Sequence, residues 1–105
     1  MEKTEEVASL MDQLSKAYAD PEVKADQRLS KLIMKCAQVL EETNDVNLVS
    51  AGFRIHLSNY DFYFQKGKLP KSVANLYDLC KKNKGKYNPL DFNHYFGVVK
   101  FIRHF

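Results

Sequence analysis

The sequence predicts an all-α fold, an antiparallel up-down four-helix bundle formed by a single domain over residues 1–105. Three observations predict it. Apolar residues recur at helical spacing in four successive stretches, the connections between these stretches are short, and no internal repeat or linker divides the chain. The expected helices cover about 4–19, 21–43, 45–66 and 70–84. A chain of 105 residues is long enough for one hydrophobic core and too short for two.

The first two expected helices meet at Asp20-Pro21. Thr4 suits the N-cap of the first helix, whose apolar stripe consists of Val7, Leu10, Met11, Leu14 and Tyr18. Asp20 suits the next N-cap and Pro21 the first helical position, where a missing N–H costs nothing. The stripe of the second helix consists of Leu29, Leu32, Ile33, Cys36, Val39 and Leu40.

The third expected helix is apolar over most of its circumference. Thr43-Asn44-Asp45 interrupts the preceding pattern and can cap this helix, and Gly67 can end it. Its main stripe consists of Val46, Val49, Phe53, His56, Leu57, Tyr60, Tyr63 and Phe64, and a flanking stripe of Leu48, Ile55 and Phe62. We therefore expect a central helix with neighbours on two sides. His56 is interpreted as a core histidine with one hydrogen bond rather than a catalytic base.

The fourth expected helix follows Leu69-Pro70 and is short. Its stripe consists of Val73, Leu76, Tyr77 and Cys80, and lysines cluster at its C-terminal end before Gly85, where the helix dipole favours them. The two cysteines, Cys36 and Cys80, both fall inside apolar stripes. We interpret them as small buried hydrophobic residues with free thiols.

Residues 86–105 can form a short fifth helix that begins at Asn88-Pro89. Its apolar positions are Phe92, Tyr95, Phe96, Val99 and Ile102, and Gly97 weakens it. A flexible tail, or an extended run over 98–102, is equally compatible with the pattern. The three aromatic residues at 92, 95 and 96 either fold back as core or contact a partner, and the pattern does not decide between these roles.

Charge divides the chain unevenly. Residues 1–64 carry 7 Lys and Arg against 11 Asp and Glu, whereas residues 65–105 carry 9 against 2, so a net charge of +3 combines an acidic body with a basic end. Five of the 13 Phe and Tyr residues fall in the last fourteen positions. Apolar residues interleaved with cations are typical of a surface that meets a membrane interface or a partner.

Motifs of catalysis and metal binding are missing from the sequence. The three histidines and two cysteines show no metal-ligand spacing, no Gly-x-Ser-x-Gly elbow holds a nucleophile, and the four glycines form no phosphate-binding loop. We therefore expect a binding protein rather than an enzyme, with no cofactor and no metal. An acidic N-terminus without a long apolar segment predicts a cytosolic protein.

The order of these features resembles a known family. An acidic first helix is followed by Asp20-Pro21, the stripe over 29–40, Val46-Asn47-Leu48-Val49, and an aromatic helix ending Tyr60-Asp61-Phe62-Tyr63-Phe64-Gln65-Lys66. A short helix around 73–82 comes next. Over about residues 5–85 this pattern resembles the enterocin A-type immunity proteins against pediocin-like (class IIa) bacteriocins. Leu69-Pro70 departs from the threonine that often caps the fourth helix there, and the aromatic tail has no counterpart that can be aligned.

The resemblance implies a cytosolic, non-catalytic protein that protects a Gram-positive cell from a membrane-permeabilising peptide. The implied partners are the mannose phosphotransferase permease, which is the bacteriocin's membrane receptor, or the bacteriocin itself, with peripheral contact to the anionic inner leaflet. The C-terminal segment 86–105 is then the expected recognition segment. The candidate partner-binding residues are Lys81, Lys82, Lys84, Lys86, Tyr87, Phe92, Tyr95, Phe96, Lys100, Phe101, Arg103 and Phe105.

Two other function classes fit parts of the sequence. A basic helical domain can be a nucleic-acid-binding regulator, but Lys far outnumbers Arg in the basic half and no helix-turn-helix with a polar recognition face is evident. No nucleic acid is therefore expected as a partner. A small protein-neutralising module, such as an antitoxin or an enzyme inhibitor, is the remaining alternative.

Overall fold

The computed structural model describes residues 2–58 and 69–97, with side chains described from Glu5 onward. This part of the chain consists of helices and connections without strands. The helices are α1 (Glu2–Ala19), α2 (Pro21–Lys24), α3 (Gln27–Thr43), α4 (Val46–Ser58), α6 (Lys71–Lys82) and α7 (Pro89–Phe96). The prediction of an all-α fold is confirmed.

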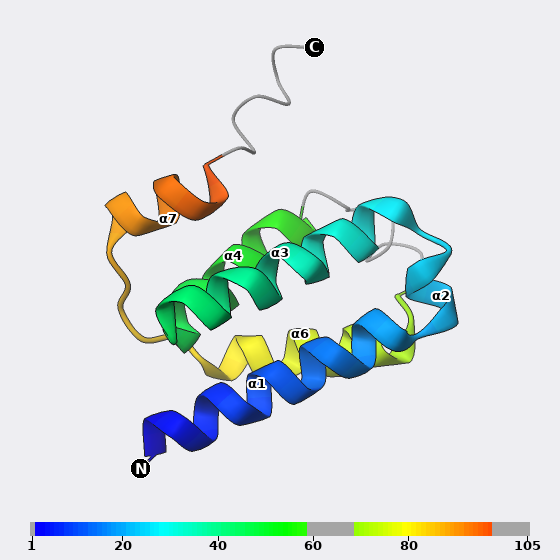
Figure 1. Cartoon of the computed structure of the whole chain (residues 1–105), viewed down its shortest axis with the longest axis horizontal. Helices are drawn as coiled ribbons and strands as arrows, with labels where there is room; N and C mark the ends of the chain where they lie inside the picture. Colours follow the sequence, from blue (N-terminus) through cyan, green and yellow to red (C-terminus); the bar gives the residue numbers. More distant parts are fainter. Residues whose placement is uncertain (1, 59–68, 98–105) are drawn as a thin grey trace.

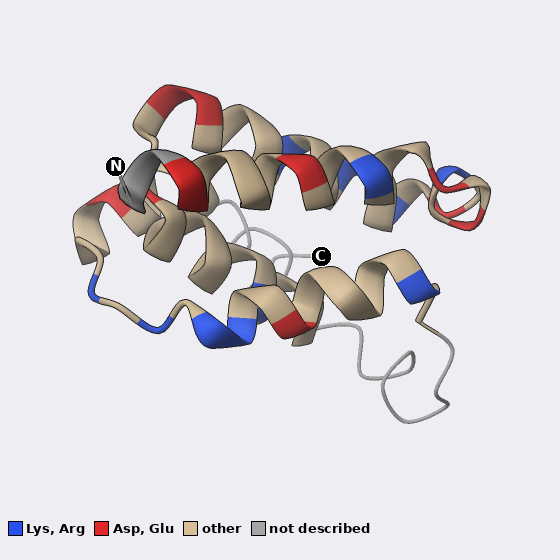
Figure 2. Cartoon of the chain, turned by 90° about the horizontal axis from the view of Figure 1, so that it is seen from below, with Lys and Arg blue, Asp and Glu red and all other residues tan. Residues whose placement is uncertain are grey.

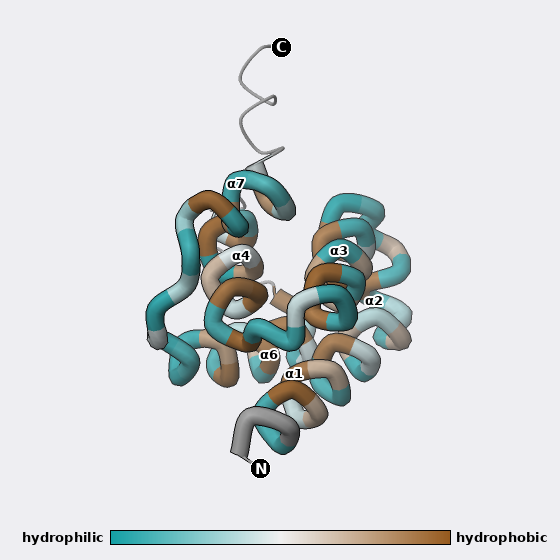
Figure 3. Tube along the Cα trace, turned by 60° about the vertical axis from the view of Figure 1, so that its left-hand side comes forward, coloured by the Kyte–Doolittle hydropathy of each residue, from teal (hydrophilic) through white to brown (hydrophobic). Residues whose placement is uncertain are grey.

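Four of these helices form the bundle. Helix α1 packs against α3 and α6, and α4 packs against the same two helices from the other side. In Figure 1, α3 and α4 form one layer above α1 and α6, and successive long helices run in opposite directions. Seen roughly end-on in Figure 3, the four helices surround a common interior.

The predicted stripes supply the core of the bundle. Leu10, Leu14, Ile33, Phe53 and Leu76 are all at most 1% exposed, and burial of one such side chain contributes about 1.5–3 kcal/mol. Tyr18, expected in the first stripe, is instead 38% exposed at the edge of the core.

Both cysteines lie in this core as free thiols, as predicted. Burial raises the pKa of the Cys80 thiol to about 11 and raises that of Cys36 further. Both thiols therefore stay protonated at neutral pH, and they pack as small hydrophobic side chains.

The expected second helix is divided, which corrects the prediction of one helix over 21–43. Helix α2 ends at Lys24, and Asp26 caps α3 by accepting hydrogen bonds from the N–H groups of Arg28 at 3.1 Å and Leu29 at 3.3 Å. Aspartate competes for backbone N–H groups and so favours a cap over a helix interior. The break allows Val23 to reach the core, where it is fully buried.

Asp20 joins the start of α2 to the start of α6. As predicted, it caps α2, with one carboxylate oxygen accepting from the Glu22 N–H at 2.9 Å. Its other oxygen accepts from the Ser72 hydroxyl at 2.5 Å. Pro70 precedes α6 without a side-chain cap, and the Asp20–Ser72 hydrogen bond joins this end of α6 to the α1–α2 junction.

The interruption predicted at Thr43-Asn44-Asp45 is confirmed. The Thr43 hydroxyl donates to the Val39 carbonyl at 2.8 Å, and the Asp45 carboxylate accepts from the Leu48 N–H at 3.0 Å. Between them, Asn44 adopts a left-handed conformation with φ of 54°. These three residues turn the chain within a single loop, which makes α3 and α4 antiparallel neighbours.

Other boundaries differ from the expected ones by a few residues. Helix α1 begins at Glu2 rather than after Thr4, and α6 spans Lys71–Lys82 rather than 70–84. The expected continuation of α4 through Tyr60, Phe62, Tyr63 and Phe64 to Gly67 lies outside the described residues.

The short fifth helix is present as α7. The Asn88 side chain caps it by accepting from the Leu90 N–H at 2.8 Å, and Pro89 occupies its first position. Among the described residues the helix ends at Phe96, followed by Gly97 as its C-cap. Val99 and Ile102 lie outside the described residues.

Asp20 should make the bundle sensitive to acid. The hydrogen bond from Ser72, followed by that from the Glu22 N–H, lowers the pKa of Asp20 below its ordinary value of 3.8. Its contribution to stability is therefore present above about pH 4 and lost as the pH falls through the lowered pKa. We expect Asp20→Asn to be less stable than the wild type at pH 5–7, with the difference shrinking below pH 4, in urea denaturation at a series of pH values. Asp78→Asn, an exposed change on α6, should show no such trend.

Position 44 should tolerate glycine, but a residue with a Cβ atom, such as alanine, should destabilise the left-handed conformation there. The left-handed conformation costs an ordinary L-residue about 1–2 kcal/mol, and asparagine and glycine accept it more readily than others. Asn44→Ala should lower the free energy of unfolding by about 1 kcal/mol, whereas Asn44→Gly should leave it nearly unchanged. Equal losses in both variants, measured by urea denaturation, would show that the asparagine side chain matters and the φ angle does not.

Candidate recognition surface

The candidate surface consists of the end of α6, the connection 83–88 and α7. Helix α7 lies over the outer side of α4, away from the bundle interior (Figures 1 and 3). Its last residue, Phe96, is completely buried. The ring lies directly on the α4 backbone at Gly52, where a Cβ atom would come within 2.5 Å of two ring carbons.

His56 forms a hydrogen bond with the backbone carbonyl of Phe96. Its Nε2 lies 3.1 Å from the Phe96 carbonyl oxygen, and the two rings are 5.7 Å apart at their centroids. Because a carbonyl only accepts, Nε2 carries the proton. The single hydrogen bond expected for His56 is present, but the side chain is half-buried beneath α7 and does not lie in the core as predicted. Burial lowers the pKa of His56, with Lys35 of α3 adding to the effect and the hydrogen bond to Phe96 opposing it.

Aromatic rings connect α7 to the segment before it. The rings of Tyr87 and Phe92 lie 5.7 Å apart, and those of Phe92 and Phe96 lie 5.4 Å apart. Tyr95 donates a hydrogen bond to Glu42 at the end of α3, and partial desolvation together with this carboxylate raises the pKa of Tyr95. Helix α7 is thus attached to both α4 and α3.

The buried position of Phe96 corrects its inclusion among residues that contact a partner. Of the two roles left open by the sequence, the structure assigns Phe96 to the core, because its side chain is 0% exposed. Phe92 and Tyr95 are partly buried against the same core, so only part of each ring faces outward.

The connection between α6 and α7 is held by polar residues of α4. The Asn83 side chain donates to the Ser50 hydroxyl at 3.2 Å, and the Asn47 side chain donates to the Lys86 carbonyl at 3.4 Å. Gly85 passes so close to Asn47 that a Cβ atom there would lie 2.3 Å from its amide nitrogen. Sequence reasoning did not assign a role to Asn47, Ser50 or Gly52. Their one shared signal is that small and polar residues interrupt an otherwise apolar helix.

The four predicted lysines of this region are all exposed. Lys81 and Lys82 lie in the last turn of α6, and Lys84 and Lys86 lie in the connection, which Figure 2 shows in blue. Within the described residues these lysines form no ion pair, and Lys81 lies over the Tyr77 ring at 5.5 Å. Their charges are available to an anionic partner.

Leu90 is an exposed apolar residue that sequence reasoning missed. It is 75% exposed in the first turn of α7, whereas Phe92 and Phe96 turn inward. Its position in the sequence gave no signal, because an isolated leucine does not reveal which side of a short helix faces the bundle. The other predicted contacts, Lys100, Phe101, Arg103 and Phe105, lie outside the described residues.

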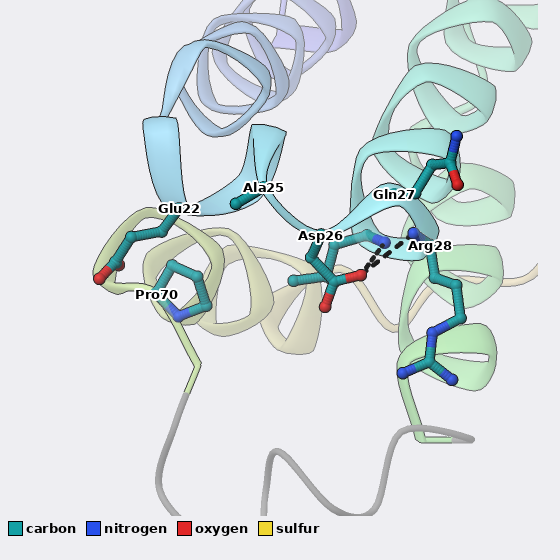
Figure 4. A pocket seen from close by; sticks show the side chains of 7 residues that line it. Glu22, Ala25, Asp26, Gln27, Arg28 and Pro70 are labelled. Carbon is teal, nitrogen blue, oxygen red and sulfur yellow. Dashed lines mark hydrogen bonds between the residues drawn. The ribbon is translucent and has the colours of Figure 1, made fainter.

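A hollow at the opposite end of the bundle is a weaker candidate for a functional site. It has a volume of about 630 Å³ and is lined by α2, the start of α3 and Pro70. Figure 4 shows that Asp26, its central carboxylate, is already used to cap α3. Among residues 2–58 and 69–97 no three His, Cys, Asp or Glu side chains are grouped as a metal site would need. We therefore place the candidate site at α6, the connection and α7.

The described part of the chain is a four-helix bundle with a group of exposed lysines at one end. Comparison with known proteins identifies its family. The chain belongs to the bacteriocin immunity protein family, which it matches over residues 2–84. Proteins of this family are non-catalytic, so the chain is not an enzyme. The match ends before α7.

One relative carries a more specific description. The chain is 38% identical over 77 residues to a protein of Carnobacterium maltaromaticum described as a carnobacteriocin-B2 immunity protein. The aligned region spans 67% of this chain and 65% of that relative, just under two thirds of its length. No solved structure matches the chain significantly. None of the described helices is both long and apolar enough to cross a membrane.

The attachment of α7 should weaken in mild acid. Because the pKa of His56 is lowered in the folded chain, unfolded or detached states take up its proton first as the pH falls. Stability should thus be complete above about pH 6.5 and decline below that value. We expect His56→Gln, which keeps an N–H donor, to show a smaller decline between pH 7.5 and 5.5 in urea denaturation. His94→Gln, at an exposed position on α7, should decline like the wild type.

Proposed function

We propose that this protein protects the cell that makes it against a pediocin-like bacteriocin, acting from the cytoplasmic side of the membrane. The family membership supports an immunity role, and the name of the Carnobacterium relative supports a bacteriocin of this class as the agent resisted. The partner in this proposal is the mannose phosphotransferase permease that serves as the peptide's receptor, alone or with the peptide bound.

The observation that carries the proposal is the exposed group of four lysines at the end of α6 and in the connection, together with the exposed Leu90 on α7. Charged side chains that lack partners in the described structure stay hydrated at little cost and can be transferred to an anionic partner. Each lysine near an anionic membrane surface contributes about 1 kcal/mol, within a screening distance of about 8–10 Å. Leu90 then supplies an apolar contact, which adds affinity and specificity that charge alone does not provide.

Contact with the inner leaflet belongs to the same proposal. A receptor embedded in the membrane presents its cytoplasmic surface beside anionic lipid, so lysines at 81, 82, 84 and 86 would serve both contacts. Lys100, Phe101, Arg103 and Phe105 would extend the surface toward the C-terminus. The lipid contact orients the protein, and the receptor contact determines which bacteriocin is resisted.

Survival of sensitive cells tests the proposal. The chain is expressed in a strain sensitive to pediocin-like peptides, and the inhibitory concentration of each member of a peptide panel is measured. We expect protection against a subset of the panel, at least tenfold for the cognate peptide. Expression at normal levels without protection against any member would contradict the immunity role in that host.

Charge reversal tests the surface itself. Lys84→Glu/Lys86→Glu changes two exposed side chains outside any helix, so folding should be unaffected and protection should fall at least tenfold. Lys24→Glu/Lys31→Glu is the matched control, with two exposed lysines on α2 and α3, and should protect like the wild type. Equal protection by both pairs, at equal protein levels, would place recognition elsewhere.

A further inference from the structure

Helix α4 carries a seat for Phe96 that only glycine can provide. An ideal Cβ at Gly52 would lie 2.5 Å from two atoms of the Phe96 ring and 2.7 Å from a third. Real Cβ atoms do not approach other atoms so closely, so the ring occupies the space of the missing side chain. Any larger residue at 52 forces the ring, and with it the end of α7, away from α4.

Two further contacts restrain the segment at its ends. His56, one turn after Gly52 on α4, donates to the Phe96 carbonyl at 3.1 Å. Asn47, more than one turn before Gly52, donates to the Lys86 carbonyl at 3.4 Å. The segment from 86 to 96 is therefore attached to α4 where it begins and where it ends.

This attachment sets the rotation of α7 about its own axis. At about 100° per residue, Phe92 and Phe96 lie on one side of the helix, and Leu90 lies about 120° round from Phe96. With the two phenylalanines against the bundle, Leu90 is left 75% exposed. A different rotation would cover Leu90 and expose a phenylalanine instead.

We propose that Gly52 and His56 are positioning residues that hold α7 in the one orientation that presents Leu90 to the partner. The inference rests on the proposed function and deepens it, because it assigns specificity to the docked orientation of α7 as well as to its sequence. Neither residue contacts the partner. They act through Phe96.

Gly52→Ala separates this role from a contribution to folding. Alanine is the better helix former by about 1 kcal/mol, so helix α4 and the melting temperature of the bundle should be unchanged or improved. The added Cβ should nevertheless displace Phe96. We expect hydrogen exchange in a peptide covering 89–97 to become at least tenfold faster, and protection against the cognate bacteriocin to fall at least tenfold.

A control and a rescue accompany this variant. Ser58→Ala changes an exposed side chain of α4 whose hydroxyl donates to the Ile55 carbonyl and which lies about 160° round the helix from His56. It should exchange and protect like the wild type. Gly52→Ala/Phe96→Leu removes the ring atoms nearest the new Cβ, and should bring both the exchange rate and the protection to within threefold of the wild type.

Each outcome decides the proposal. Unchanged exchange over 89–97 in Gly52→Ala would show that Phe96 is not seated on Gly52, and fast exchange with full protection would show that the orientation of α7 is not needed. Either result overturns it. If even the wild type protects against no peptide, the proposed function fails, and the exchange rates of the single and double variants then decide by themselves whether Gly52 positions α7.

Discussion

The arrangement depends on the burial of α4 on two adjacent sides. One side packs into the bundle through Val49, Phe53 and Leu57, and the other receives Phe96 of α7 at Gly52. A helix covered twice must be apolar or small nearly all the way round, and eight of its thirteen residues are buried. This constraint gives α7 its place, and α7 in turn leaves Leu90 exposed.

The attachment of α7 is energetically modest. Burial of one phenylalanine contributes up to about 3 kcal/mol, whereas ordering the backbone of each residue costs about 1–2 kcal/mol. An isolated helix of eight residues is too short to be stable in water. Helix α7 therefore needs all of its attachments together: the Gly52 seat, the His56 and Asn47 hydrogen bonds, and the contact between Tyr95 and Glu42.

Charge and packing are separated along the chain. The acidic residues of α1 to α3 lie mainly on solvent-facing sides or at helix starts, where Asp20, Asp26 and Asp45 accept backbone N–H groups. The lysines at the end of α6 and in the connection have no such structural use among the described residues. The net charge of +3 is therefore the sum of two unlike parts. The acidic part contains the aspartates that cap helices, and the basic part contains lysines that are exposed to solvent.

Local pattern alone determined the number of bundle helices, their antiparallel order, the caps at Asp20 and Asp45, and the buried cysteines. Each follows from spacing within one helix or one turn. The division at Asp26, the role of Gly52 and the exposure of Leu90 were decided only by tertiary structure. From the sequence alone, Gly52 is expected only to weaken the helix. Its role depends on the Phe96 ring that occupies the space of a side chain, and Phe96 lies more than forty residues away in the sequence. The exposure of Leu90 could not be predicted, because the rotation of a short helix is set by its neighbours in the fold. Sequence periodicity predicts the buried side of each helix separately. Which residues remain exposed on the assembled surface depends on how the helices pack against one another.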